Sequence, residues 1–129
     1  MVERHLAITP VAPFTERFTR VRHRFASSLE NKIDGVYTAL PKLAGEGEAV
    51  AEVVDENYRR IHDIAGVSPS IGFVATGRAA RAVENILNPA RSARRGLKPD
   101  EIDLLKNALH ALRQTSQQEL QSTLFADRR

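Results

Sequence analysis

With 129 residues, the chain is long enough for one domain with its own hydrophobic core. The absence of cysteine excludes disulfides, thiolate metal sites and cysteine nucleophiles, and it fits a reducing compartment such as the cytoplasm. The formal net charge of +3 at pH 7 suits an acidic partner, but most basic residues are dispersed along the chain, so nucleic-acid binding is not favoured.

The composition favours packed helices over sheet, because alanine and leucine outnumber valine and isoleucine and there is no tryptophan. No apolar run approaches the roughly 20 residues that cross a bilayer. The N-terminus also lacks the apolar core of a secretion signal. We therefore expect an unprocessed cytoplasmic protein with no membrane segment.

A long amphipathic helix is predicted near the start of the chain. From Phe14 to Leu40, apolar residues recur every three or four positions, as they do along one face of a helix. Residues 1–12 precede this pattern and are expected to be flexible. Pro41 can end or kink the helix near residue 40, and the glycines in the segment 45–47 predict a turn.

A second helix should begin near Glu48. Pro69 lacks a backbone donor and would distort this helix, whereas Gly72 can adopt the left-handed conformation that closes a helix. We therefore predict that the second helix ends at Gly72, with a distortion near Pro69. Its expected buried residues are Val50, Val53, Val54, Ile61 and Ile64.

The third helix is predicted over residues 73–87, because Asn88 and Pro89 would stop it. Its expected inward residues are Val74, Ala79, Val83, Ile86 and Leu87. A basic loop follows, and such a charged segment is usually solvated. The loop contains Arg91, Arg94, Arg95 and Lys98.

A fourth helix should start at Pro99, because proline suits the first helical position and the acids at positions 100 and 101 suit the positive end of the helix dipole. The helix can continue toward Leu120 or Leu124. Its apolar stripe consists of Ile102, Leu105, Leu109 and Leu112.

These four helices and their short connections predict the fold class. An up-down antiparallel four-helix bundle is the simplest way to bury four apolar stripes in one all-α core. No segment requires a strand. We expect residues 1–129 to form a single domain, with residues 125–129 flexible in the same way as residues 1–12.

The segment around His62 carries the clearest functional pattern. His62 follows Ile61, about 100° around the helix, so we expect it at the edge of the apolar face and partly exposed. Ala65 and Gly66 follow on the same helical face and leave room for a partner to approach. A neutral imidazole with one free nitrogen can attack a phosphoryl group. The pattern therefore indicates a histidine that another protein must reach.

The segment from about residue 50 to residue 88 resembles the histidine-containing phosphotransfer domain of two-component signalling, including that of chemotaxis histidine kinases. The family pattern is a histidine, an aliphatic residue two positions later, glycines four and ten positions later, and in the chemotaxis type a glutamate 22 positions later. The matching residues are His62, Ile64, Gly66, Gly72 and Glu84. The resemblance implies that His62 is the phosphorylated nucleophile and that Glu84 orients its ring from the neighbouring helix.

One position departs from the family pattern, because Ala65 stands where the family has a lysine. A cation at that position would attract the phosphoryl oxygens through charge-assisted hydrogen bonds. Arg81 and Arg59 are the candidate phosphate-binding residues in its place, since either guanidinium could reach a phosphate on His62. Arg81 is preferred, because the family has a basic or polar residue at that spacing.

The resemblance also implies a role and partners. The chain would be a phosphohistidine intermediate that accepts a phosphoryl group from receiver-domain aspartates and donates it to others. The receivers would belong to response regulators or hybrid histidine kinases. The chain lacks a glycine-rich nucleotide loop, so we expect no ATP-dependent kinase activity of its own. No cofactor is expected in the chain, and Mg²⁺ would be held by the partner receiver domain.

Two alternative functions remain open. Because the lysine is absent, the bundle could bind a kinase or a response regulator without being phosphorylated. It could also be a basic helical module that binds nucleic acid. The histidines at positions 5, 23 and 110 have no comparable setting and no metal-ligating partner at helical spacing, so we expect them to be ordinary surface or boundary residues.

Overall fold

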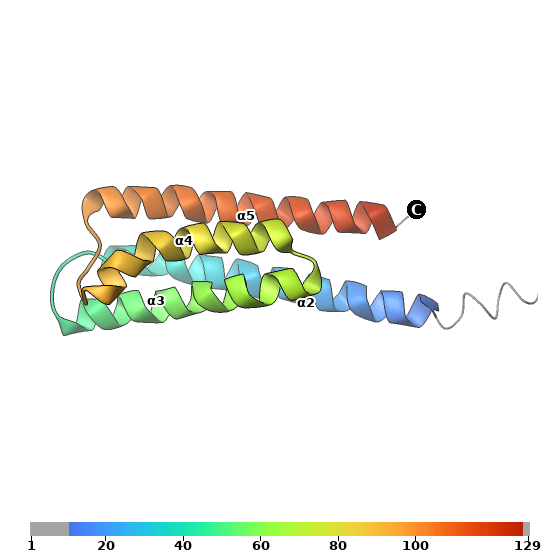
Figure 1. Ribbon diagram of the computed structural model, residues 1–129, viewed down its shortest axis with the longest axis horizontal. Helices are drawn as coiled ribbons and strands as arrows, with labels where there is room; N and C mark the ends of the chain where they lie inside the picture. Colours follow the sequence, from blue (N-terminus) through green and yellow to red (C-terminus); the bar gives the residue numbers. More distant parts are fainter. Residues whose placement is uncertain (1–10, 128–129) are drawn as a thin grey trace, which may run out of the picture.

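The computed structural model describes residues 11–127, and this part of the chain folds into four helices and two short 3-10 turns. The helices are α2 (Val11–Ala39), α3 (Glu48–Val67), α4 (Val74–Ser92) and α5 (Pro99–Asp127), and the turns are η1 (Leu40–Lys42) and η2 (Ser68–Ile71). Successive helices run antiparallel and pack side by side (Figure 1). The predicted all-α up-down four-helix bundle is therefore confirmed.

Parts of the first and last helices, α2 and α5, occupy segments that were expected to be flexible. Residues 11–12 belong to α2 and residues 125–127 belong to α5. The remaining residues of the two segments expected to be flexible, 1–10 and 128–129, lie outside the described part of the chain. Across residues 11–127 no strand is found, and no helix is both long and apolar enough to cross a membrane.

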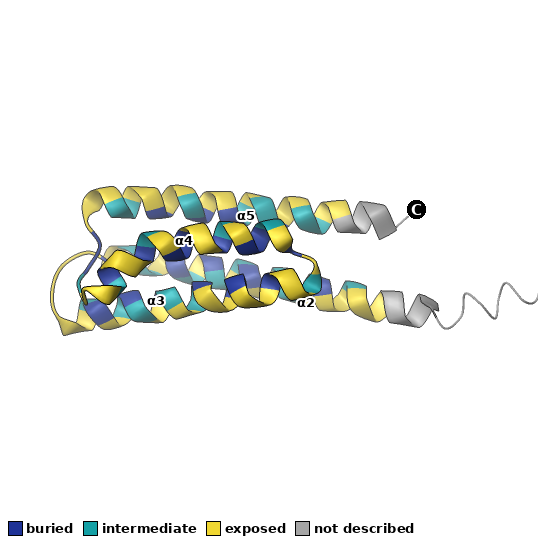
Figure 2. Cartoon of the chain, in the orientation of Figure 1, coloured by how far each residue is buried: buried dark blue, intermediate teal, exposed yellow. Residues whose placement is uncertain are grey.

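One hydrophobic core is shared by all four helices (Figure 2). The predicted stripe of α2 is buried at Leu29, Ile33 and Val36, but Phe18 and Val21 are exposed. α2 extends past the connection between α3 and α4 (Figure 1), and in the turn that contains Val21 the buried residue is Arg22, which is 7% exposed and lies over the Phe73 ring. The other fully buried large residues include Val54, Ile61, Ile64, Val83, Leu87, Leu105, Leu109 and Leu112.

The connection from α3 to α4 differs from the prediction in one respect. The α-helical part of α3 ends at Val67, and a 3-10 turn that contains Pro69 continues to Ile71. Gly72 then takes the left-handed conformation, with φ of 87°, so it closes the 3-10 turn instead of the α-helix. A Cβ atom at Gly77 would lie 3.1 Å from Cγ of Pro69, so glycine at this position favours the close packing of α4 on η2.

The predicted end of the third helix at Asn88 and Pro89 is wrong. α4 continues to Ser92 with Pro89 inside its last turns. Proline removes one helical hydrogen bond, yet Ala90, the next residue, is still helical and fully buried in the core. A second misplacement is Val74, which was expected to face inward and is instead 46% exposed at the first position of α4.

At the opposite end of the bundle the loop before α3 and the loop before α5 lie side by side. The backbone N–H of Leu97, before α5, donates a hydrogen bond to the carbonyl oxygen of Leu43, before α3, over 2.7 Å. A Cβ atom at Gly96 would overlap the carbonyl oxygen of Gly45, so the close approach requires glycine. α5 begins at Pro99 as predicted.

Candidate functional site

His62 lies on the surface of α3, one position after the fully buried Ile61. Its side chain is 60% exposed, as its place at the edge of the apolar face predicts. The core therefore fixes the backbone beneath the imidazole while the ring itself stays open to solvent and to other molecules.

Glu84 is the direct partner of His62 across the α3–α4 interface. Its Oε1 atom lies 2.5 Å from Nδ1 of His62, and its side chain is 9% exposed. An ionised carboxylate accepts a hydrogen bond, so in the neutral imidazole Nδ1 carries the proton and Nε2 has the lone pair. The structure thus brings together the two residues that the 22-residue spacing singled out, and it leaves Nε2 as the free nitrogen of the imidazole.

The two candidate phosphate-binding arginines have different settings. Nη1 of Arg81 lies 3.7 Å from Oε2 of Glu84, so Arg81 borders the carboxylate that holds His62. Nη2 of Arg59 lies 3.1 Å from Oδ2 of Asp55, one turn earlier on α3. Both guanidinium groups are largely exposed. Arg81 is tied to the His62–Glu84 pair, whereas Arg59 must leave Asp55 to approach it.

Ala65 does not have the exposure expected of it. The residue is 1% exposed, because it lies on the side of α3 that packs into the core. Gly66, in contrast, is exposed, and a Cβ atom there would meet no atom within 4 Å. Open space beside His62 is therefore found at Gly66 and not at Ala65. Ala65 is buried and uncharged, so it cannot contact a partner.

Sequence reasoning missed a second set of contacts beside His62. The ring of Tyr58, one turn earlier on α3, is nearly parallel to the imidazole, with an interplanar angle of 13° and ring centroids 5.8 Å apart. The guanidinium of Arg91, from α4, lies 4.2 Å from the centre of the Tyr58 ring. The spacing of four residues between Tyr58 and His62 could have indicated the stack, but the contribution of Arg91 depends on the register of two helices.

Three arginines of the predicted basic loop are paired with acids, and one of them, Arg91, lies in the last turn of α4 and not in the loop. Arg91 pairs with Asp55, Arg94 with Glu48, and Arg95 with Glu101. The hydrogen bond between the last two lowers the pKa of the Glu101 carboxyl and raises the pKa of Arg95. The loop is therefore not an open cationic patch of the kind that binds nucleic acid.

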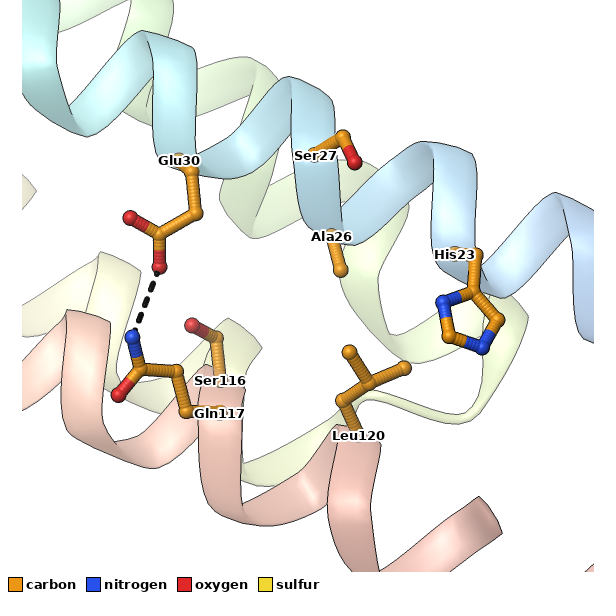
Figure 3. Close-up of a pocket in the computed structure, with 7 residues that line it drawn as sticks. All are labelled: His23, Ala26, Ser27, Glu30, Ser116, Gln117 and Leu120. Carbon is orange, nitrogen blue, oxygen red and sulfur yellow. Dashed lines mark hydrogen bonds between the residues drawn. The ribbon is translucent and has the colours of Figure 1, made fainter.

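A shallow hollow lies on a different pair of helices, between α2 and α5 (Figure 3). His23 and Leu120 line one part of it, and a hydrogen bond of 3.3 Å joins Gln117 to Glu30 in another. No group of three or more histidine, cysteine, aspartate or glutamate side chains suited to a metal is found among the described residues. His110 is exposed on α5, and His5 lies outside the described part.

One of three comparisons with known proteins finds a match. A family model described as Hpt domain, the histidine-containing phosphotransfer domain, matches residues 20–115, which include all of α3 and α4. No curated protein and no solved structure matches the chain. The matched range spans most of the chain and contains His62, Glu84 and both candidate arginines.

Proposed function

The chain belongs to the Hpt domain family, whose members take part in two-component phosphotransfer, and we propose that it does so as a phosphohistidine intermediate carried on His62. The observation that supports this proposal best is the contact between Nδ1 of the exposed His62 and the nearly buried Glu84. That contact leaves Nε2 as the nitrogen that an incoming phosphoryl group would meet.

In the proposed step, the lone pair of Nε2 attacks the phosphorus of an aspartyl phosphate on a receiver domain. The N–P bond forms as the bond between phosphorus and the aspartate oxygen breaks, and the aspartate leaves as a carboxylate. The imidazole keeps its proton on Nδ1 and becomes positively charged. The carboxylate of Glu84 stabilises that charge through the hydrogen bond, and the reverse step passes the phosphoryl group to another receiver.

Arg81 is the proposed cation for the phosphoryl oxygens in place of the lysine of the family. Its contact with Glu84 keeps it on the α4 side of His62, and its exposed guanidinium can turn toward a bound phosphate. Arg59 is the second candidate, from the α3 side. Its pairing with Asp55 has to be exchanged for the phosphate, so we expect a smaller contribution from it.

The partners follow from the family, since Hpt domains interact with receiver domains. For this chain we propose receivers of response regulators or hybrid histidine kinases, in the cytoplasm. Mg²⁺ would be bound by the receiver and not by this chain, which would need no cofactor and have no ATP-dependent kinase activity. The exposed site around His62 and Gly66 is the proposed docking surface.

The proposal is tested by incubating the chain with a phosphorylated receiver domain and Mg²⁺. We expect acid-labile, base-stable phosphate on the wild type and none on His62→Gln, because a glutamine amide cannot form the phosphoramidate. His110→Gln is the matched control, since it removes another exposed helical histidine and should keep full labelling. Full labelling of His62→Gln would overturn the assignment. The lifetimes of the label on Arg81→Ala and Arg59→Ala then rank the two arginines.

The alternative of binding without phosphorylation has one observation in its favour, the absence of any cation at Ala65. It predicts that the wild type and His62→Gln bind a receiver with equal affinity and that the wild type takes up no phosphate. The nucleic-acid alternative predicts binding to DNA that weakens steeply with salt. The paired arginines of the basic loop argue against the latter.

A further inference from the structure

Two polar bridges join α3 to α4 in the same register. Nδ1 of His62 contacts Glu84, and two turns nearer the start of α3 the Oδ1 atom of Asp55 lies 2.9 Å from Nε of Arg91. His62 follows Asp55 by seven residues and Arg91 follows Glu84 by seven, which is about two turns on each antiparallel helix. Tyr58 lies on the turn of α3 between these two bridges.

The Tyr58 ring is held from several sides. It is half-buried and packs against the core, and the Arg91 guanidinium lies over its ring. Arg91 in turn is fixed by Asp55, which also holds Arg59. An aromatic ring with these contacts has little freedom to leave its place beside His62.

A hydrogen bond alone does not define the orientation of the imidazole. The contact with Glu84 restrains the distance between Nδ1 and Oε1, but concerted rotation about the Cα–Cβ and Cβ–Cγ bonds can keep that distance while the plane of the ring turns. The His62 side chain is 60% exposed, so few other neighbours restrict the tilt. The nearly parallel Tyr58 ring is the contact that does so, since tilting the imidazole would break the stack.

We propose that Tyr58, held by Arg91 and Asp55, is a positioning residue that fixes the plane of the His62 ring. The consequence for the reaction rests on the function proposed above, because the ring plane sets the direction of the Nε2 lone pair toward an incoming phosphorus atom. Loss of the stack should slow phosphoryl transfer about three- to tenfold, the factor that one aromatic pair contact typically carries.

The orientation itself is tested by NMR on the unphosphorylated protein, with the His62 ring signals assigned through His62→Gln. We expect cross-relaxation between the ring protons of Tyr58 and His62 in the wild type. We also expect His62 ring signals shifted upfield by the Tyr58 ring current, a shift that Tyr58→Leu abolishes and Tyr58→Phe keeps. Absence of cross-relaxation, or unchanged His62 signals in a folded Tyr58→Leu protein, would overturn the proposal.

The chain offers a matched control in Tyr37, the other tyrosine. It is also half-buried, and the guanidinium of Arg113 lies 5.2 Å from its ring centre, but Tyr37 is on α2 and has no stacked histidine. Tyr37→Leu should leave the His62 ring signals and the transfer rate unchanged. A loss of rate equal to that of Tyr58→Leu would mean that packing, and not ring orientation, is responsible.

The transfer rate is then measured with a phosphorylated receiver domain. Tyr58→Leu should be about three- to tenfold slower than the wild type, and Tyr58→Phe should restore the rate because the stacking ring is retained. If Tyr58→Phe is as slow as Tyr58→Leu, the positioning role is wrong. If the wild type takes up no phosphate, the proposed function fails, and the NMR measurements still decide whether Tyr58 orients His62.

Discussion

The two ends of the bundle are held by different kinds of contact. At one end the loops before α3 and α5 lie side by side, and a backbone hydrogen bond joins Leu97 to Leu43. At the other end η2 connects α3 to α4, and the first turn of α4 is held by a side chain, because Glu119 of α5 accepts hydrogen bonds from the backbone N–H groups of Ala75 and Thr76. His62 lies on the C-terminal part of α3, toward this second end.

This difference between the two ends suggests that the contacts that stabilise the fold and the contacts that surround His62 lie in different parts of the bundle. At the loop end the close backbone approach at Gly96 leaves no room for a side chain, and ion pairs such as Arg95–Glu101 add to that contact. Side-chain contacts at the η2 end hold α4 in place while the surface around His62 and Gly66 stays open. Substitutions at the loop end should therefore act mainly on stability, and substitutions at the η2 end should also change the dynamics of the site.

The largest effect is expected from Gly96→Ala at the loop end. The added Cβ would overlap the backbone oxygen atoms of Gly45 and Leu43, and backbone atoms cannot move aside as a flexible side chain can. We expect a loss of about 3 kcal/mol in the free energy of unfolding, the upper part of the usual range for overpacking. Urea unfolding followed by circular dichroism measures it.

Gly66→Ala is the matched control for that substitution. A Cβ atom at this position meets nothing within 4 Å, and alanine is favoured over glycine inside a helix by about 1 kcal/mol. Gly66→Ala should therefore leave the protein equally stable or more stable. If both glycine substitutions lower the free energy of unfolding equally, the close approach of the two loops at Gly96 does not determine the loss.

The helices could be predicted from the sequence more completely than the contacts between them. Three- and four-residue spacing located α2, and the proline followed by two acids located the start of α5. Pro89 misled the prediction for α4, because the helix continues through it to Ser92 while Ala90 packs into the core, and no local pattern reports that packing. Local propensity is weaker than tertiary packing at such positions.

In the candidate site, too, the sequence predicted some residues but not the contacts that depend on how the helices pack. The spacing from His62 to Glu84 identified a pair that the structure joins, but that spacing came from a family resemblance and not from helix geometry alone. The Tyr58–Arg91 contact could not be predicted, since it requires the register between α3 and α4. Ala65 was placed on an accessible face because residues three apart share a helix side, yet the core covers that part of α3.

An intermediate effect is expected from Glu119→Ala at the η2 end. Glu119 accepts hydrogen bonds of 3.1 Å from Ala75 N, 2.7 Å from Thr76 N and 2.7 Å from the Thr76 hydroxyl, and it does for α4 what an N-cap residue would do. Phe73, at the N-cap position, provides no side-chain cap. We expect a loss of about 1–2 kcal/mol in unfolding free energy and faster amide hydrogen exchange at Ala75 and Thr76.

Glu119→Gln sharpens that test, because the amide oxygen can still accept one of the hydrogen bonds. Its loss of stability should be smaller than that of Glu119→Ala. The exchange rates should change in the first turn of α4 and not in the loop at the other end. Equal protection of Ala75 and Thr76 in both variants and the wild type would show that the first turn of α4 does not depend on α5.

The smallest effect, and one that depends on pH, is expected from Glu101→Gln at the loop end. Glu101 accepts hydrogen bonds from Arg95 over 2.7 Å and from the backbone N–H of Lys98 over 2.8 Å, and the Arg95 bond is the main cause of its lowered pKa. A carboxyl with a lowered pKa in the folded state stabilises the protein above its unfolded-state pKa of about 4.3, and the stabilisation is lost as the pH falls through the folded-state value.

Glutamine keeps an acceptor for Lys98 but carries no charge, so the variant isolates the contribution of the charge. At pH 7 we expect Glu101→Gln to be less stable than the wild type by about 0.5–1 kcal/mol, as for a partly exposed ion pair. The difference should shrink below pH ~4.3 and vanish once Glu101 is protonated in both states. Glu46→Gln is the control, because Glu46 is an exposed acid in the loop before α3. If the difference in unfolding free energy between the variant and the wild type stays constant from pH 7 to acid, the charge of Glu101 in the Arg95–Glu101 pair is not its cause.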